Sequence, residues 1–253
     1  MNVTYVSALY KIYAESETTN ILINNVRDLL NQPLNIVLYV DEFYYDIITK
    51  MDKSSSVSVV LLPMKELHIY NMIIENKKYI KLPTHRTPAK DNHEYLALMN
   101  TKIEFLYRAK SLITTKYAAW IDAGCSKLFK EKEKSFDRLV KANIKNIDKL
   151  LIPGCCVRNI PLDQLCNNVH WVFIGTFFII NSDYISEFYN LSLQSTARFL
   201  LAGYISWEVN TWVDIVNTKP DIYKWYYSGH DDKFTEFPEI YLQESSQTHS
   251  IDE

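Results

Sequence analysis

Three short, continuously apolar segments alternate with helix-like segments over the first quarter of the chain. The apolar segments are 3–9, 35–40 and 57–62, with the sequences VTYVSAL, NIVLYV and VSVVLL. Between them, 20–30 carries apolar residues at helical spacing and 44–51 fits a short helix. Strands that are apolar throughout are typical of a parallel sheet that is buried on both faces. The pattern therefore predicts an α/β fold with a mostly parallel central sheet flanked by helices.

The rest of the chain continues this alternation less regularly. Asp91 and Glu94 resemble a capping box, which predicts one long helix from Asp91 to about residue 114. The aromatic segment 169–180 predicts a strand, a turn at Gly175 and a second strand. Further strands are expected at 117–121, 150–153 and 222–227, and further helices at 66–76, 182–191, 193–202 and 207–216.

No internal repeat, linker or convincing domain boundary interrupts the sequence. We therefore expect a single domain over 1–242, with a nucleotide-binding half at about 1–125 and a site-completing half at 126–242. A polar tail is expected over 243–253.

The overall composition excludes several classes of protein. The chain has 253 residues and a net charge of −3, which argues against a general nucleic-acid binder. Its four cysteines form no CxxC pair, so a structural zinc site is not expected. Its five glycines form neither a dinucleotide fingerprint nor a P-loop. No signal peptide or membrane-spanning run is evident, which favours a cytoplasmic protein.

An acidic turn follows the apolar strand 117–121. The turn is Asp122-Ala123-Gly124, at the end of a strand that needs no acid for packing. Ligands of α/β folds usually bind outside the carboxyl ends of the strands. Asp122 is therefore either a turn acid that caps the next segment, or a ligand for Mg²⁺, Mn²⁺ or a ribose hydroxyl.

A second polar cluster follows the aromatic strand at 222–227. It contains His230, Asp231 and Asp232, directly after Gly229. It is either a polar surface turn or the source of an imidazole and a carboxylate for a metal ion held by Asp122. Imidazole with carboxylate and phosphate oxygens suits Mn²⁺ better than Zn²⁺.

Two further charged residues occur in apolar surroundings. Lys102 lies on the inward stripe of the predicted long helix, either extending to solvent or supplying a cation for a ligand phosphate. Glu208 follows Ser206, the predicted N-cap, and has Trp207 and Trp212 nearby. It either complements the helix dipole or acts as a general base whose pKa is raised by its aromatic surroundings.

Two other positions have weaker functional interpretations. His170 is more typical of a packed or surface histidine than of a ligand. Gly175 either lets a ligand approach the backbone closely or marks a β-bulge.

Taken together, these segments resemble a GT-A-type glycosyltransferase and, more narrowly, the HtrL/YibB-like family of bacterial and viral proteins. The resemblance covers about residues 3–235 and rests on the order and spacing of several motifs. The motifs are VTYVSALYKI, PLNIVLYVDE, EYLALMNTKIEFLYRA followed by WIDAG, HWVFIGTFFIINSDYISEFY, SWEVNTW and YSGHDD.

The resemblance implies a transferase that moves a sugar from a nucleotide sugar to a glycan or another hydroxyl acceptor. It implies that Asp122, with Ala123 and Gly124, contacts the nucleotide and the metal, and that Lys102 and Gly175 also line the donor site. By the same resemblance Glu208 would deprotonate the acceptor, in an inverting reaction.

The implied cofactor is Mn²⁺ or Mg²⁺, held by Asp122, His230 and Asp232, with Asp231 as the alternative to Asp232. The usual motif has a second acid where this chain has Gly124. That departure leaves room for a metal-independent variant in which Lys102 or Arg86 contacts the diphosphate. The resemblance is also compatible with a protein that forms a homodimer.

Two other functions compete with this one. A nucleotidyltransferase shares the layout but typically has a glycine-rich loop near its first strand, and 3–14 contains no glycine. A non-catalytic glycan-binding protein on a degenerate transferase scaffold would fit the aromatic content and the missing second acid.

Overall fold

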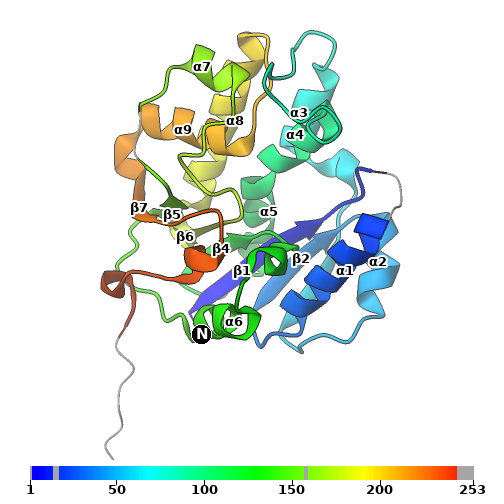
Figure 1. The fold of residues 1–253 in the computed structure, drawn as a ribbon, viewed down its shortest axis with the longest axis vertical. Helices are drawn as coiled ribbons and strands as arrows, with labels where there is room; N and C mark the ends of the chain where they lie inside the picture. The colour runs from blue at the N-terminus through cyan, green and yellow to red at the C-terminus, as the bar shows by residue number, and fades with distance from the viewer. Residues whose placement is uncertain (1, 14–16, 157–158, 244–253) are drawn as a thin grey trace, which may run out of the picture.

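The computed structural model describes residues 2–13, 17–156 and 159–243. Within them the chain forms one sheet of seven strands in the order β3-β2-β1-β4-β6-β5-β7 (Figure 1). The strands are β1 (Val3–Leu9), β2 (Ile36–Val40), β3 (Val57–Leu61), β4 (Tyr117–Ile121), β5 (Leu150–Gly154), β6 (Phe177–Asn181) and β7 (Tyr223–Tyr227). β6 is antiparallel to its neighbours β4 and β5, and the other pairs are parallel. The predicted α/β class with a mostly parallel sheet is confirmed.

Helices cover both faces of this sheet (Figure 1). One layer consists of α1 (Glu17–Leu30), α2 (Glu42–Thr49) and α6 (Lys132–Lys141). The other consists of α3 (His68–Glu75), α4 (His93–Asn100), α5 (Lys102–Arg108), α8 (Ile185–Leu201) and α9 (Glu208–Thr218), and α7 (Leu162–Asn167) contacts α9. Adjacent strand residues face opposite layers, as Tyr5 and Val6 do in β1. Each face of the sheet therefore has its own apolar core.

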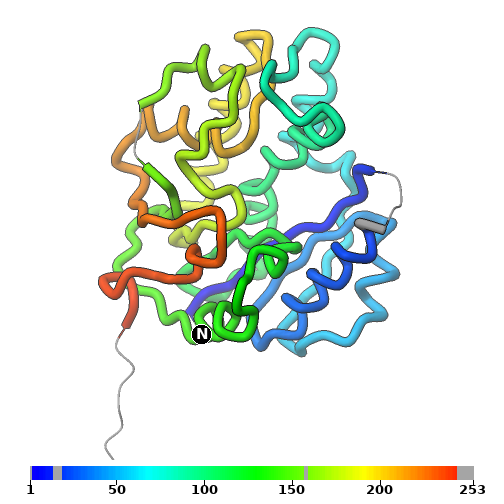
Figure 2. Tube along the Cα trace, viewed as in Figure 1, coloured from blue at the N-terminus to red at the C-terminus, as the bar shows by residue number. Residues whose placement is uncertain are grey.

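The loop between α3 and α4 is tied to the second half of the chain. Lys81 pairs with Tyr204 and His85 pairs with Asn168 in two isolated bridges. Figure 2 shows the course of the backbone as a tube coloured by residue number. Backbone hydrogen bonds from the amide of Lys81 to the carbonyl of Gly203, and from Ile205 to Lys81, reinforce the first bridge. These contacts hold the loop close to the chain that leads into α9.

The predicted long helix at 91–114 is wrong in its length and in its cap. α4 ends at Asn100 and α5 begins at Lys102. The side chains at the break bond to backbone carbonyls: Asn100 donates to Leu96 and Ser206, and Thr101 donates to Leu98. Such side-chain bonds compete with the helical ladder.

The N-cap of α4 is Asn92, whose side chain accepts from the amide of Tyr95 at 2.8 Å. The predicted cap, Asp91, instead accepts from the amide of Thr87 at 2.8 Å. The carboxylate of Asp91 is therefore turned toward the preceding loop.

Three other predicted elements also differ. Of the predicted segment 169–180, only the second half forms a strand, β6. The chain before β6 forms turns, and Phe173 pairs with Gly154 in an isolated β-bridge. The two helices expected over 182–202 form one helix, α8, preceded by a short turn capped by Asn181 rather than Ser182. α9 begins at Glu208, and its expected cap Ser206 donates instead to the carbonyl of Leu165 at 2.6 Å.

Strands from both predicted halves of the chain contribute to the single sheet. In the described part of the chain, no helix is both long and apolar enough to cross a membrane. Gln243 is bonded through its amide to Asn143, and the remainder of the predicted polar tail, 244–253, lies outside the described residues.

Candidate active site at the carboxyl ends of the strands

Asp122 directly follows β4, at the carboxyl end of that strand. Its backbone amide donates to the carbonyl of Thr176, and the indole of Trp120 donates to its Oδ1 at 2.8 Å. The side chain is 36% exposed. Asp122 is therefore held from one side while its carboxylate remains partly exposed. Its position after the strand agrees with the sequence, and its role as a ligand for a metal ion or a ribose stays a prediction.

Lys102, the first residue of α5, is buried beside Asp122 and only 3% exposed. Its ammonium donates to the carbonyl of Gly175 and to Oε1 of Glu208, both at 2.8 Å. It also lies 3.0 Å from Oδ1 of Asp122. Lys102 thus joins three segments that are far apart in the sequence.

Opposing effects act on the pKa of Lys102. Burial lowers it, because a charged amine loses its hydration, but Asp122 and Glu208 raise it more, through charge and hydrogen bonds. The pKa of Lys102 consequently lies above its ordinary value, and the group is a permanent cation. The predicted alternative in which Lys102 extends to solvent is wrong, while its contact with a nucleotide stays a prediction.

Glu208 opens α9 and is 7% exposed. The position at the first helical turn agrees with the sequence prediction, and the helix dipole favours an anion there. Of its two expected aromatic neighbours, Trp212 packs edge-on against Phe178 in the core, with ring centroids 5.3 Å apart. Trp207 lines the same cavity as Glu208.

Gly175 lies directly against Glu208. A Cβ atom at this position would be 2.5 Å from Oε1 of Glu208 and 3.3 Å from Cγ1 of Val209. The glycine therefore allows a close approach, but the group that approaches is a carboxylate of the protein. The contact with Glu208 explains the glycine at position 175 without either a ligand or a β-bulge.

We expect Gly175→Ala to displace the Glu208 carboxylate and to weaken its ion pair with Lys102. Because no side chain fits within 2.5 Å of Oε1, the variant should lose stability and, if Glu208 is catalytic, turnover as well. Gly229→Ala is the matched control, since its nearest neighbour would lie at an ordinary contact distance of 3.4 Å. Melting temperatures measured for both variants check this, and equal melting temperatures would contradict it.

A cavity of about 230 Å³ opens next to Lys102 and Asp122. Its walls come from the ends of β1 and β4, including Ala123 and Gly124, and from α4 and α5. A second cavity of about 360 Å³ adjoins it, because Tyr10, Tyr13 and Lys127 line both. Together they offer an elongated, aromatic-lined space at the carboxyl ends of the strands.

A third cavity, of about 480 Å³, lies on the Glu208 side. It is lined by polar residues of the α3–α4 loop and by Trp171 and Trp207. Tyr95 lines both this cavity and the one beside Asp122. Burial first, and then the charges of Glu208 and Asp122, raise the pKa of Tyr95, so its hydroxyl stays protonated. The carboxylates of Asp122 and Glu208, which are linked through Lys102 and are called the linked carboxylates below, therefore lie between two cavities.

Asp232, one of the predicted metal ligands, is engaged elsewhere. Its Oδ2 accepts from the hydroxyl of Ser135 at 3.1 Å and from the amide of Lys130 at 3.2 Å. Burial raises the pKa of Asp232, but these bonds and other backbone N–H groups lower it more. Asp232 therefore ties the chain after β7 to α6. The alternative ligand, Asp231, forms an ion pair with Lys130 at 3.5 Å.

His230, the predicted imidazole ligand, packs edge-on against Trp171, with ring centroids 4.6 Å apart. Burial lowers its pKa, and the charge of Asp231 opposes that shift. Across the described residues, no group of three or more His, Cys, Asp or Glu side chains has the arrangement of a metal site. In this structure the side chains of Asp122, His230 and Asp232 therefore do not lie close enough together to bind one metal ion.

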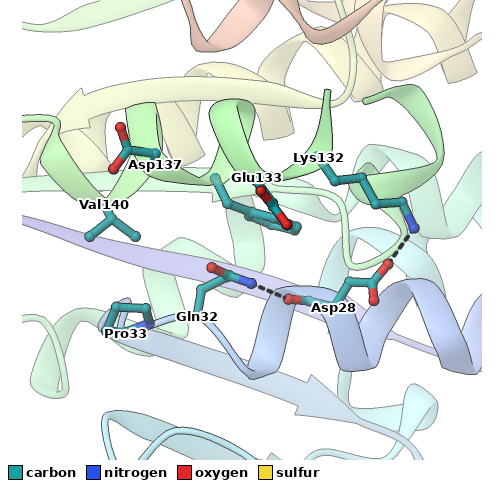
Figure 3. A pocket seen from close by; sticks show the side chains of 8 residues that line it. Asp28, Gln32, Pro33, Lys132, Glu133, Asp137 and Val140 are labelled. Atoms are coloured by element: carbon teal, nitrogen blue, oxygen red, sulfur yellow. Dashed lines mark hydrogen bonds and ion pairs between the residues drawn. The ribbon is translucent and has the colours of Figure 1, made fainter. Parts of the chain in front are cut away.

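A cavity of about 420 Å³ between α1 and α6 lies away from these residues (Figure 3). Figure 3 shows Lys132 reaching Asp28, and the two groups are 2.7 Å apart. Gln32 and Pro33, which also line it, precede β2 and so lie at the amino ends of the parallel strands. This position is at the edge opposite Asp122.

Several residues that line the site were not among the sequence-based candidates. They are Tyr13, Asp91, Tyr95, Lys127 and Trp171. Tyr95 is seven positions before Lys102, which places both on one face of the single helix that the sequence predicted, and that spacing was available as a signal. The side-chain roles of Asp91 and Trp171 depend on where loops fold, for which the sequence offers no comparable periodicity.

No protein-family model matches this sequence, and no curated protein is similar enough to count as a match. Solved structures that are similar to the chain include mouse xyloside xylosyltransferase 1 in its apo form. The TM-score is 0.48, the identity is 10%, and the match covers 89% of this chain and 85% of that chain. The narrower resemblance to the HtrL/YibB-like family is not supported by these comparisons.

Proposed function

We propose that the protein is a glycosyltransferase that moves a sugar from a nucleotide-sugar donor to a hydroxyl acceptor. The observation that carries this proposal is the pairing of Glu208 and Asp122 on the single buried cation Lys102. Asp122 faces one cavity and Glu208 faces another. Such an arrangement supports a transfer between two separately bound substrates, one on each side of the pair.

The donor fits the space beside Asp122. A nucleoside could enter between the aromatic residues Tyr10 and Tyr13, and the exposed carboxylate of Asp122 could accept a ribose hydroxyl. Lys127 lines both adjoining cavities and supplies a positive charge for a diphosphate. These assignments place the reactive sugar next to Lys102 and Glu208.

The chemistry follows from the position of Glu208. Its Oε1 accepts a hydrogen bond from Lys102, which fixes the orientation of the carboxylate. Oε2 would take the proton of the acceptor hydroxyl as that oxygen attacks the anomeric carbon. The bond between that carbon and the phosphate oxygen breaks, and its electron pair leaves with the nucleoside diphosphate. A single displacement of this kind inverts the anomeric configuration, and product NMR that showed retention would contradict it.

The predicted metal does not fit the donor atoms as they are arranged, so no step above depends on it. Manganese dependence stays a prediction, and the binding experiment below tests it directly. Asp122→Ala and His230→Ala are expected to weaken nucleotide-sugar binding in the presence of Mn²⁺. Unchanged binding in calorimetry would remove either residue from the site.

The first experiment is a thermal-shift screen of UDP-, GDP-, CMP- and dTDP-sugars, each with and without Mn²⁺. A ligand that binds only the folded protein adds about 2.7 kcal/mol at a hundred times its Kd, which corresponds to a rise in Tm of about 5–10 °C. We expect one nucleotide to produce such a rise. No rise with any donor would favour a non-catalytic glycan-binding protein.

A further inference from the structure

Two residues that line the cavity on the Glu208 side carry a buried polar atom without a hydrogen-bond partner. Among the described residues, these include Oδ1 of Asp91 and Nε of Arg86. Asp91 is only 5% exposed. Because a buried polar atom without a partner costs about 1–3 kcal/mol, each of these atoms calls for a partner, which is either a water molecule or a polar group of a ligand.

The rest of each side chain is firmly held. Oδ2 of Asp91 accepts from the amide of Thr87, and Nη1 of Arg86 donates to the carbonyl of Pro83 at 3.1 Å. The unpaired atoms are therefore on side chains whose positions are already fixed. This pre-organisation reduces the entropy that a ligand would have to overcome on binding.

The two unpaired atoms need opposite partners. The carboxylate oxygen of Asp91 can only accept a hydrogen bond, while Nε of Arg86 can only donate one. A hydroxyl group can do both, so a ligand with several hydroxyls satisfies the pair. The mixed signs of the surrounding charges, with Arg86 and Lys90 beside Asp91 and Glu208, argue against a strongly charged ligand.

An aromatic surface completes the cavity. Trp171 lines it and is 51% exposed, and its ring packs in a T-shaped arrangement with His230. An exposed indole face packs well against the apolar C–H face of a sugar ring. The cavity volume of about 480 Å³ is within the range of small-molecule sites.

We propose that this cavity, defined by Asp91, Arg86, Trp171 and Glu208, binds the acceptor as a neutral pyranose. The sugar ring lies on Trp171, its hydroxyls bond to Asp91 and Arg86, and one hydroxyl faces Glu208. The identification of this sugar as the acceptor rests on the proposed transferase function. The pyranose site itself is argued only from the residues that line the cavity.

The test is saturation-transfer-difference NMR on the full chain with methyl glycosides of glucose, galactose, mannose, xylose and N-acetylglucosamine. Methyl glucuronide and methyl glucosaminide are included as charged probes. We expect a signal from at least one neutral pyranoside. Asp91→Asn, which keeps an oxygen for Thr87, should weaken its binding about tenfold, and Trp171→Ala about three- to tenfold.

Trp225→Ala is the matched control, since Trp225 is a 37% exposed tryptophan of β7 that does not line the cavity. Its binding of the pyranoside should equal that of the unaltered protein, even though loss of a partly buried tryptophan lowers the melting temperature. The proposal is overturned if no neutral pyranoside gives a signal, if a charged probe binds better, or if Asp91→Asn and Trp171→Ala bind as the control does.

The thermal-shift screen with nucleotide sugars separates this inference from the proposed function. Donor binding without a pyranoside signal would overturn the pyranose site alone. Pyranoside binding that depends on Asp91, without binding of any donor, would support the site and overturn the transferase.

Discussion

Lys102→Met is expected to lower the free energy of unfolding by about 3–5 kcal/mol, the cost of leaving a buried charge without its partner. Lys102 is 3% exposed and the side chain of Glu208 is 9% exposed, so water replaces the lost ammonium only in part. For a chain of this size the loss corresponds to a fall in Tm of about 6–20 °C. Denaturant unfolding monitored by circular dichroism measures it.

The double variant Lys102→Met with Glu208→Gln serves as the control for this interpretation. Removing the buried carboxylate should restore part of the stability, because the second substitution leaves no unpaired charge at that position. If the two substitutions were simply additive, Lys102 would stabilise the fold by packing and not through its ion pair.

Glu208→Gln is expected to reduce turnover of a nucleotide sugar by about 10²–10⁴-fold, the usual contribution of a general base. The amide keeps an oxygen that can accept from Lys102, so the fold and donor binding should be preserved. A progress assay for released nucleoside diphosphate, together with a thermal shift by the donor, measures both quantities.

Glu94→Gln is the matched control for that experiment. Glu94 is a partly exposed residue of α4 that pairs with Lys77 at 3.6 Å, and it lines neither of the two cavities beside the ion pair. Its variant should turn over substrate normally. If Glu208→Gln lost donor binding together with turnover, a structural role for Glu208 would explain the result better than base catalysis.

The strands were predictable because burial on both faces leaves a continuous apolar run. β1 and β4 have the bounds that their sequences indicated, Val3–Leu9 and Tyr117–Ile121. Helix ends were less predictable, since they are decided by local competition for backbone hydrogen bonds. The break at Thr101 depends on a hydrogen bond from Asn100 to Ser206, which is remote in the sequence.

The site was predictable as single residues but not as a network. A lysine on an apolar helical stripe and an acid at a strand end are both visible in the sequence. The contacts that Lys102 makes with Asp122 and with Glu208, which is 106 positions away, exist only after folding. Conversely, Asp232 had the right chemistry for a metal ligand, yet Ser135, equally remote, occupies its carboxylate.

The reversed direction of β6 bears on how such a protein could change its substrate. β5 ends and β6 begins at the same edge of the sheet, the edge where β4 also ends. The excursion between β5 and β6, which carries Trp171 and Gly175, therefore leaves and re-enters the sheet above the linked carboxylates. The described part of this excursion contains two kinds of residue: Trp171 is exposed, whereas Leu165 and Phe173 belong to the apolar core. Changes at exposed positions such as Trp171 can therefore alter the ligand surface while every strand keeps its register and the core stays intact.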